Sequence, residues 1–204
     1  MRIRIDPENP EFDKIETVVN CLKDGGIIVY PTDTIYGIGC DIYNLRAIER
    51  IGKIKGIDPK KTNMSFVCSS LANISDFVLP FNRNIFKIMN KNLPGPFTFV
   101  LKGSNTVPKI FKNNKKTVGI RVPNHKVATS IVERLEHPIL SSSLNKIDDV
   151  EEYLVDPDLI YDAYKDKVDI MIDGGFGNYT GSTVVDCSGD SVEILRQGAG
   201  ELEY

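Results

Sequence analysis

The hydrophobic positions of this 204-residue chain follow two different spacings. Apolar residues three and four apart predict helices, whereas short, continuous apolar runs bounded by Pro or Gly predict buried strands. Helical spacing predicts helices over residues 10–23, 44–54, 79–91, 123–135 and 157–165. Compact apolar runs predict strands over residues 26–30, 35–40, 63–68, 97–102, 117–122, 138–144, 168–173, 183–187 and 192–196.

Helices and strands mix along the whole chain, with short connections and no Pro- or Ser-rich linker. This mixture predicts a single α/β domain over residues 1–204, in which helices pack on a mixed sheet of parallel and antiparallel strands. With 41% hydrophobic residues, such a chain forms a core without disulfides or a structural metal. The four cysteines form no CxxC pair, so we expect small buried hydrophobic side chains and no metal site.

Charge is distributed unevenly, although the net charge is only -3. Twelve basic residues lie between residues 53 and 116 against two acids, whereas residues 148–166 hold eight acids and one lysine. This asymmetry favours an anionic ligand, a nucleotide or RNA, on one side of the protein. For any single lysine, ordinary solvated surface is the alternative.

The N-terminus lacks the apolar stretch of a secretory signal, and no apolar run reaches the roughly 20 residues of a membrane span. We therefore expect a cytoplasmic protein with no membrane contact. Several common sites are excluded, because the chain contains no GxGxxG after a strand, no GxxxxGK[ST], no GxSxG and no HExxH. With only His125 and His137 available, nucleophilic catalysis assisted by histidine is not favoured.

Polar side chains instead collect where apolar strands end, which is where ligands bind in open α/β sheets. Arg121 is the most informative of them, because it lies inside the apolar run TVGIRVP. A buried guanidinium must be paired with an acid or be ready to bind an anion. Both alternatives stay open for Arg121.

Seven motifs in a fixed order cover nearly the whole chain: GGIIVYPTDTIYGIG, IGKIKG, LPGPFTFVLKG, TVGIRVPNH, LSSSLN, GSTVVD and ILRQGAG. Together they resemble the YrdC/YciO family of threonylcarbamoyl-AMP synthases. The resemblance implies a YrdC-like fold, with a twisted sheet around a basic concave cavity. Because the chain ends soon after ILRQGAG, we expect no appended C-terminal domain.

The resemblance also implies a reaction. L-threonine and bicarbonate form a carbamate, whose oxygen attacks the α-phosphate of ATP in the presence of Mg; pyrophosphate leaves, and threonylcarbamoyl-AMP remains for modification of adenosine 37 of tRNA. The family is further described as binding tRNA and double-stranded RNA. Such chemistry needs no protein nucleophile, because it depends on positioning and on charge neutralisation.

Transferred to this chain, the resemblance assigns threonine to Thr34, Arg121, Ser141 and Ser182, with Arg121 on the carboxylate. Nucleotide binding falls to Lys55, Thr117, Ser143, Asn145 and Arg196. Lys55 and Arg121 are the residues expected to act in catalysis, and no residue is assigned as a metal ligand. The protein is expected to be a monomer or a homodimer.

The sequence departs from the synthase pattern at two positions, and in this it is similar to the YciO branch. Ile57 stands where the synthases have the arginine of a KxR motif, and Cys68 stands where they have a histidine. Lys60 or Lys61, in a lengthened loop, is a candidate to replace the missing positive charge. The leading interpretation is a synthase-type nucleotidyltransferase of reduced activity. The alternative is a YciO-like protein that binds RNA or nucleotides with little or no synthase activity, and a third interpretation is hydrolysis of an adenylate in the same cavity.

Overall fold

The computed structural model describes the chain except residues 60–61, 63, 109–115, 146–150 and 190. The described residues form a ten-stranded mixed sheet in the order β1-β8-β2-β3-β7-β4-β6-β5-β9-β10. The strands are β1 (Arg2–Arg4), β2 (Ile27–Tyr30), β3 (Gly37–Asp41), β4 (Ser65–Val67), β5 (Phe97–Lys102), β6 (Thr117–Arg121), β7 (Ile139–Ser143), β8 (Ile170–Asp173), β9 (Thr183–Asp186) and β10 (Glu193–Arg196).

The helices are α1 (Phe12–Lys23), α2 (Leu45–Lys55), α3 (Arg83–Asn92), α4 (Lys126–Leu135) and α5 (Pro157–Tyr164), with short 3-10 turns at Leu71–Ile74 and Glu151–Leu154. Parallel pairs such as β4–β6 and β5–β9 alternate with antiparallel pairs such as β5–β6 and β4–β7. The predicted single-domain α/β fold with a mixed sheet is therefore confirmed.

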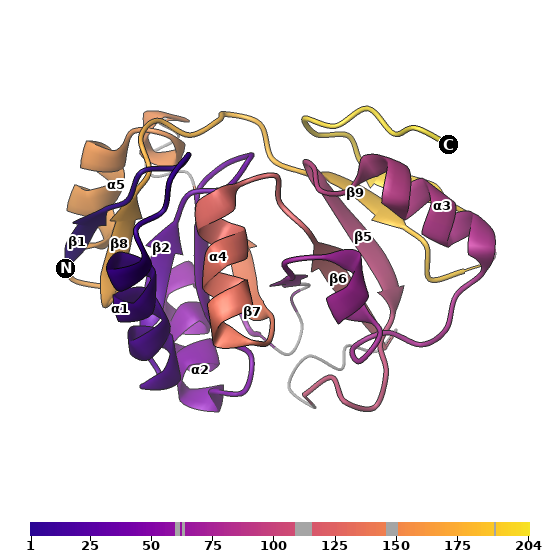
Figure 1. Cartoon of the computed structure of the whole chain (residues 1–204), viewed down its shortest axis with the longest axis horizontal. Coiled ribbons are helices and arrows are strands. Elements are labelled where there is room, and N and C mark those ends of the chain that lie inside the picture. Colours follow the sequence, from indigo (N-terminus) through magenta and orange to yellow (C-terminus); the bar gives the residue numbers. More distant parts are fainter. Residues whose placement is uncertain (60–61, 63, 109–115, 146–150, 190) are drawn as a thin grey trace.

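Two hydrophobic clusters hold the helices on opposite faces of the sheet. Helices α1 and α4 pack on one face, through residues such as Val18 and Ile131 against Ile28 and Ile139. Helices α2, α3 and α5 pack on the other face, with Ile51, Ile88 and Ile160 in one cluster with buried strand residues. Figure 1 shows α1 and α4 side by side over one part of the sheet, with α3 at the far end. Part of the first face is thus left without a helix.

Local capping explains where element boundaries differ from the predictions. Helix α3 begins at Arg83 and not at Leu79, because the side chain of Asn82 accepts a hydrogen bond from the backbone N–H of Ile85 at 2.9 Å. Helix α4 begins at Lys126, because the backbone of His125 is extended and the turn before it is held by the hydrogen bond from the N–H of Asn124 to Asp33. Strand β3 begins at Gly37, two residues later than predicted, where its pairing with Tyr30 of β2 starts.

Strand β1 was not predicted, because its sequence Arg-Ile-Arg gives no apolar run. It forms only through parallel pairing with β8, where Ile3 lies opposite Ile172.

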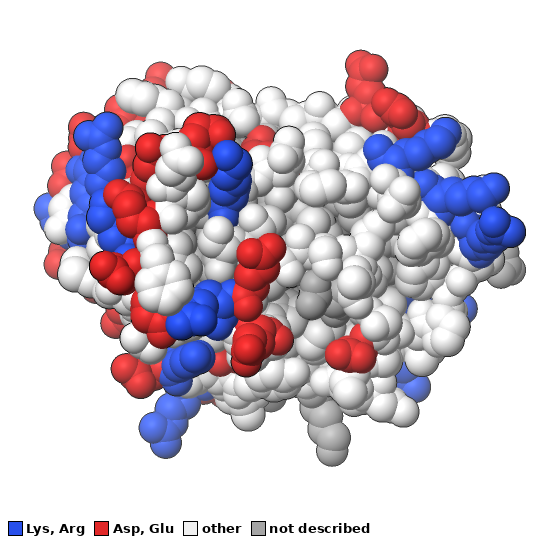
Figure 2. Space-filling model, viewed as in Figure 1, with Lys and Arg blue, Asp and Glu red and all other residues white. Residues whose placement is uncertain are grey.

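Charged side chains gather towards the two ends of the face in Figure 2, and the middle of that face is largely uncharged. Within the described part of the chain, no helix combines the length and the hydrophobicity needed to cross a bilayer.

Candidate active site

The register of the sheet places four small residues next to one another in one cross-strand row. Partners in such a row point to the same face, so their sizes determine how much space lies above the sheet. A Cβ placed at Gly119, in the middle of the row, would lie 3.1 Å from Cγ2 of Thr98. The row reads Gly39, Ser141, Ser65, Gly119, Val100, Asp186 and Glu193 across β3, β7, β4, β6, β5, β9 and β10.

A cavity of about 340 Å³ lies over the middle of this row. It lies on the face of the sheet that carries α1 and α4, because Ser65 and Ser141 are two residues along their strands from Val67 and Ile139, which pack in that cluster. Its volume is within the range of small-molecule sites. The structure gathers all the predicted site residues except Thr34 in its wall: Lys55, Thr117, Arg121, Ser141, Ser143, Asn145, Ser182 and Arg196.

Arg121 is both ion-paired and part of the cavity wall. Its side chain is 7% exposed, and its Nη2 donates to Oδ1 of Asp33 at 2.9 Å and to Oγ1 of Thr34 at 3.0 Å. Its Nε is buried with no hydrogen-bond partner among the described residues. Arg121 is therefore both paired with an acid and able to bind an anion. Its Nη2 forms the ion pair with Asp33, and its other N–H groups form no hydrogen bond within the described chain and belong to a residue that lines the cavity.

Thr34 lies behind the cavity wall, where it holds the guanidinium in place. Oγ1 of Thr32 donates to the carbonyl of Ile35 at 2.9 Å, so its single proton is used. In the 3.1 Å contact between the two threonine hydroxyls, Thr34 must therefore be the donor. The lone pairs of Thr34 then accept from Arg121, which gives this buried hydroxyl a positioning role.

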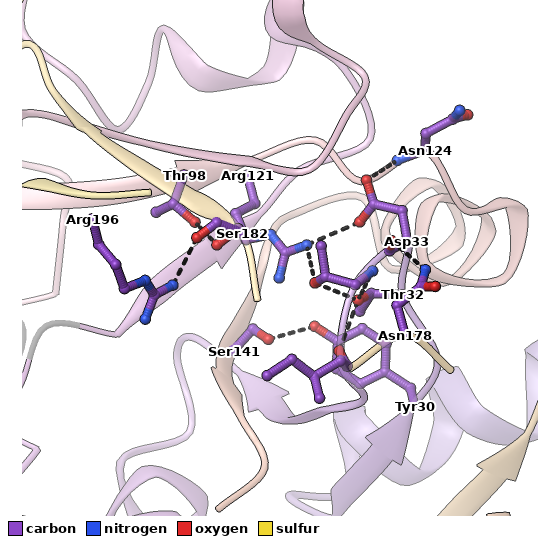
Figure 3. Close-up of polar contacts among 12 residues, drawn as sticks. Tyr30, Thr32, Asp33, Thr98, Arg121, Asn124, Ser141, Asn178, Ser182 and Arg196 are labelled. Atoms are coloured by element: carbon purple, nitrogen blue, oxygen red, sulfur yellow. Dashed lines mark hydrogen bonds and ion pairs between the residues drawn. The ribbon is translucent and has the colours of Figure 1, made fainter. Parts of the chain in front are cut away.

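Asp33 connects four segments of the chain (Figure 3). Besides Arg121, its Oδ2 accepts from the backbone N–H of Asn124 at 3.0 Å, and its carbonyl accepts from Nδ2 of Asn178 at 2.9 Å. The turn after β2, strand β6, the start of α4 and the glycine-rich loop before β9 thus meet at one residue, the first three at its carboxylate and the loop at its backbone carbonyl. The position of Arg121 therefore depends on contacts between segments that are far apart in the sequence.

Hydroxyl groups lie on two sides of the cavity. Oγ of Ser182 is 2.8 Å from Oγ1 of Thr98. The backbone carbonyl of Ser182 accepts a hydrogen bond from Nη2 of Arg196 at 2.8 Å (Figure 3). Across the cavity, Tyr30 donates its phenolic proton to Oγ of Ser141 at 2.6 Å. Burial raises the pKa of Tyr30 to about 12, so the phenol remains a donor. The proton of Ser141 is consequently available to a ligand.

Lys55 extends from the C-terminus of α2 to the end of β7. Its Nζ donates to the carbonyl of Ser143 and to Oδ1 of Asn145, the latter at 2.8 Å. Burial lowers the pKa of Lys55 to about 8. A bound anion would favour the charged form, so this amine is suited to contact a phosphate.

The lining residues combine three cations, Lys55, Arg121 and Arg196, with one carboxylate, Asp186. Since Asp33 neutralises Arg121, the excess positive charge comes from Lys55 and Arg196. Asp33, Asp186 and Thr98 were missed as site residues, although each lies inside a motif that the sequence contains: PTDT, GSTVVD and PGPFTF. Nothing local distinguishes them, because their roles depend on contacts between distant strands.

The two departures from the synthase pattern lie outside the cavity wall. The backbone N–H of Ile57 donates to the carbonyl of Gly52 at 2.9 Å, in the turn that ends α2. Cys68 is fully buried in a hydrophobic cluster, and burial raises the pKa of its thiol to about 12. Lys60 and Lys61, the proposed substitutes for the missing positive charge, lie outside the described residues.

An open α/β sheet whose cavity is lined by hydroxyls and an excess of cations is typical of proteins that bind small anions and nucleotides. The Sua5/YciO/YrdC family model, described as telomere recombination, matches residues 20–198. The chain therefore belongs to the Sua5/YciO/YrdC family.

The comparisons cover both branches of this family. The chain is 36% identical over 201 residues to the uncharacterized protein YciO of Escherichia coli K12, covering 98% of this chain and 96% of YciO. It is 29% identical over 163 residues to a threonylcarbamoyl-AMP synthase of Coxiella burnetii, covering 80% of this chain and 86% of the synthase.

Solved structures agree with these similarities. The crystal structure of E. coli YciO matches with a TM-score of 0.91 at 35% identity, covering 98% of this chain and 97% of that one. The structure of P. abyssi Sua5 complexed with L-threonine matches with a TM-score of 0.85 at 25% identity, covering 97% of this chain and 57% of that one.

Proposed function

We propose that this protein is a nucleotidyltransferase of the threonylcarbamoyl-AMP synthase type. The amine of L-threonine attacks bicarbonate and water leaves, which gives a carbamate. A carbamate oxygen then attacks the α-phosphorus of ATP, and the bond to the bridging oxygen of pyrophosphate breaks. The product, threonylcarbamoyl-AMP, would supply modification of adenosine 37 of tRNA in the cytoplasm.

One observation carries this proposal: residues assigned one by one from separate motifs, on α2, β6, β7, β10 and the loops next to β7 and β9, line one cavity with excess positive charge. In the proposal, Arg121 binds the threonine carboxylate, with Thr34 holding the guanidinium and Ser141 and Ser182 donating hydrogen bonds. Hydrogen bonds from a guanidinium to a carboxylate are charge-assisted, and Nη1, unlike Nη2, is not used by Asp33 or Thr34. The similarity to the Sua5 structure complexed with L-threonine supports this assignment.

The nucleotide is assigned to the other residues of the wall. Lys55 and Arg196 would neutralise phosphate charge, and Thr117, Ser143 and Asn145 would bind the adenylate through oxygen and amide groups. Catalysis then consists of placing two anions against each other and neutralising the charge at the α-phosphate.

The test is pyrophosphate release with ATP, Mg²⁺, L-threonine and bicarbonate, together with detection of threonylcarbamoyl-AMP. We expect release to require both threonine and bicarbonate and to fall in Lys55→Met. The matched control is Lys102→Met, which removes an exposed lysine at the end of β5, outside the cavity. Release no higher than without enzyme would contradict the proposal.

A second candidate function is binding of tRNA or double-stranded RNA with little synthesis. Ile57, Cys68 and the similarity to YciO favour it. Helix α3 adds exposed Arg83, Lys87 and Lys91 at intervals of four residues, and a group of blue side chains lies at this end of the molecule in Figure 2, next to a group of red ones. Affinity for tRNA should fall steeply with salt and fall further in Lys87→Gln/Lys91→Gln; no affinity at low salt would exclude this candidate.

A further inference from the structure

Asp186 is the one carboxylate among the described residues that line the cavity. It ends β9 and is half-buried, and its Oδ1 accepts a hydrogen bond from the backbone N–H of Ser188 at 2.8 Å. No basic residue in the described part of the chain forms an ion pair with it. Its second oxygen thus has neither a salt bridge nor a hydrogen bond from those residues.

This carboxylate is unfavourable in a cavity that binds anions. A phosphate entering the cavity would be repelled by Asp186 unless a cation lay between them. Neither neighbouring cation pairs with Asp186, since Arg196 donates to the carbonyl of Ser182 and Lys55 donates to Ser143 and Asn145.

The strand pairing adds a second negative charge beside the first. Glu193 of β10 lies directly opposite Asp186 in the antiparallel pair, so the two carboxylates share one face. Like charges in such pairs are destabilising. Glu193 is exposed and does not line the cavity, so it increases the negative potential at the rim without entering the site.

We propose that Asp186 is the protein ligand for the divalent cation that enters with ATP, an inference that rests on the proposed function. Mg²⁺ is commonly held by one or two carboxylates together with substrate phosphates and water, not by a cage of protein ligands. Asp186 fits this arrangement, since it is a single carboxylate in the cavity wall that uses one oxygen for the N–H of Ser188. When bound, the metal would neutralise charge on the phosphates.

The position of Asp186 is consistent with this role. It lies in the same cross-strand row as Gly119, two strands away across β5. At about 4.8 Å per strand, this separation is roughly 10 Å. Asp186 and the Arg121 end of β6 therefore face different parts of the cavity, one suited to a metal-phosphate group and the other to a carboxylate.

The experiment compares ATP affinity with and without Mg²⁺ in the wild type and in Asp186→Asn. The amide keeps the size of the side chain and an oxygen for the N–H of Ser188, so the variant removes the charge alone. In the wild type, we expect Mg²⁺ to tighten binding of α,β-methylene-ATP by about tenfold. In Asp186→Asn, binding in EDTA should be as tight or tighter, whereas the gain from Mg²⁺ should be largely lost.

Mn²⁺ provides a direct readout that is independent of turnover. Paramagnetic resonance of free Mn²⁺ in the presence of α,β-methylene-ATP should show more Mn²⁺ bound than the nucleotide binds alone in the wild type and in Glu193→Gln, and a smaller excess in Asp186→Asn. Asp186→Ser, whose hydroxyl can also accept from Ser188, serves as a second charge-removing variant if Asp186→Asn does not fold.

The outcomes separate this inference from the proposed function. If ATP binds and the effect of Mg²⁺ is the same in Asp186→Asn as in the wild type, Asp186 only stabilises the turn, and the inference is overturned. An equal loss in Glu193→Gln would indicate a general surface potential and would overturn it too. If the wild type binds no ATP in either medium, the proposed function and the inference both fail.

Discussion

The pair of Arg121 and Asp33 determines the character of the cavity at the scale of single residues. Their side chains are 7% and 10% exposed, so neither charge is solvated. Breaking a buried ion pair is costly because the remaining charge stays buried without a partner. The pair therefore keeps a guanidinium at the cavity wall that the core would not otherwise tolerate.

A double-mutant cycle tests this interdependence. We expect Asp33→Ala to lower the free energy of unfolding by about 3–5 kcal/mol, and Asp33→Ala/Arg121→Met to recover much of the loss. Urea denaturation measures both. Glu8→Ala, which breaks the exposed ion pair with Lys126, is the control and should cost about 1 kcal/mol or less. Strictly additive effects of the Asp33 and Arg121 substitutions would contradict the coupling.

Lys55 gives the stability of the protein a pH dependence of definite sign. Burial lowers its pKa from 10.5 in the unfolded chain to about 8 in the folded protein. Between these values the unfolded state binds more protons, so the contribution of Lys55 to stability increases as pH rises from about 8 to 10.5. Relative to Lys55→Met, the wild type should therefore gain unfolding free energy across this window, measured by urea denaturation at a series of pH values. A difference that does not change with pH would show that Lys55 is not desolvated.

At the scale of elements, the paired strands provide the floor of the cavity. Strand β6 contributes Thr117, Gly119 and Arg121 to the cavity and Ile120 to the core, while Val118 packs in the core and also contacts the cavity. This alternation follows from the two-residue repeat of a strand. A single strand thus carries both the packing that holds the sheet and the side chains that a ligand would contact.

Filling the floor should block the site. In Gly119→Val, the new side chain would occupy space over the row between Ser65 and Thr98, so we expect affinity for ATP to fall by about tenfold or more. Calorimetric titration measures the loss, and circular dichroism checks that the fold is retained. Gly189→Val is the control, because a Cβ at Gly189 meets nothing within 4 Å. Unchanged affinity in Gly119→Val would place the nucleotide elsewhere.

Most elements could be predicted because their signals are local. The periodicity of α2 and its cap at Asn44, whose side chain accepts from the N–H of Ala47 at 3.0 Å, are both contained in a short stretch of sequence. Strand β1 and the start of α4 could not, since they depend on β8 and on Asp33, which are far away in the sequence. Local propensity carries no information about such partners.

At the scale of the whole molecule, the cavity joins β4–β7, β9, β10 and the end of α2. A ligand bound there contacts parts of the chain that unfolding would separate. Binding to the folded state alone raises stability in proportion to the logarithm of ligand concentration.

ATP and threonine should therefore stabilise the protein together. At about 100 times the dissociation constant, each ligand adds roughly 2.7 kcal/mol. For a chain of this size, that corresponds to an increase in Tm of about 5–11 °C. Differential scanning calorimetry with ATP and Mg²⁺, with threonine, and with both measures the effect, and Arg121→Lys should lose most of the shift caused by threonine. A Tm that does not change with threonine at any concentration would contradict a threonine site.

The sequence by itself determined the helices and most strands, the mixed α/β fold and the family, because periodicity, caps and the order of the motifs can all be read from short stretches of sequence. It also named Arg121 but left its partner open. Only the tertiary structure decided that Asp33, 88 positions away, holds this guanidinium, and that Asp186 faces the same cavity. The reason is that strand order and register bring these side chains together, and both depend on long-range pairing, which no local pattern encodes.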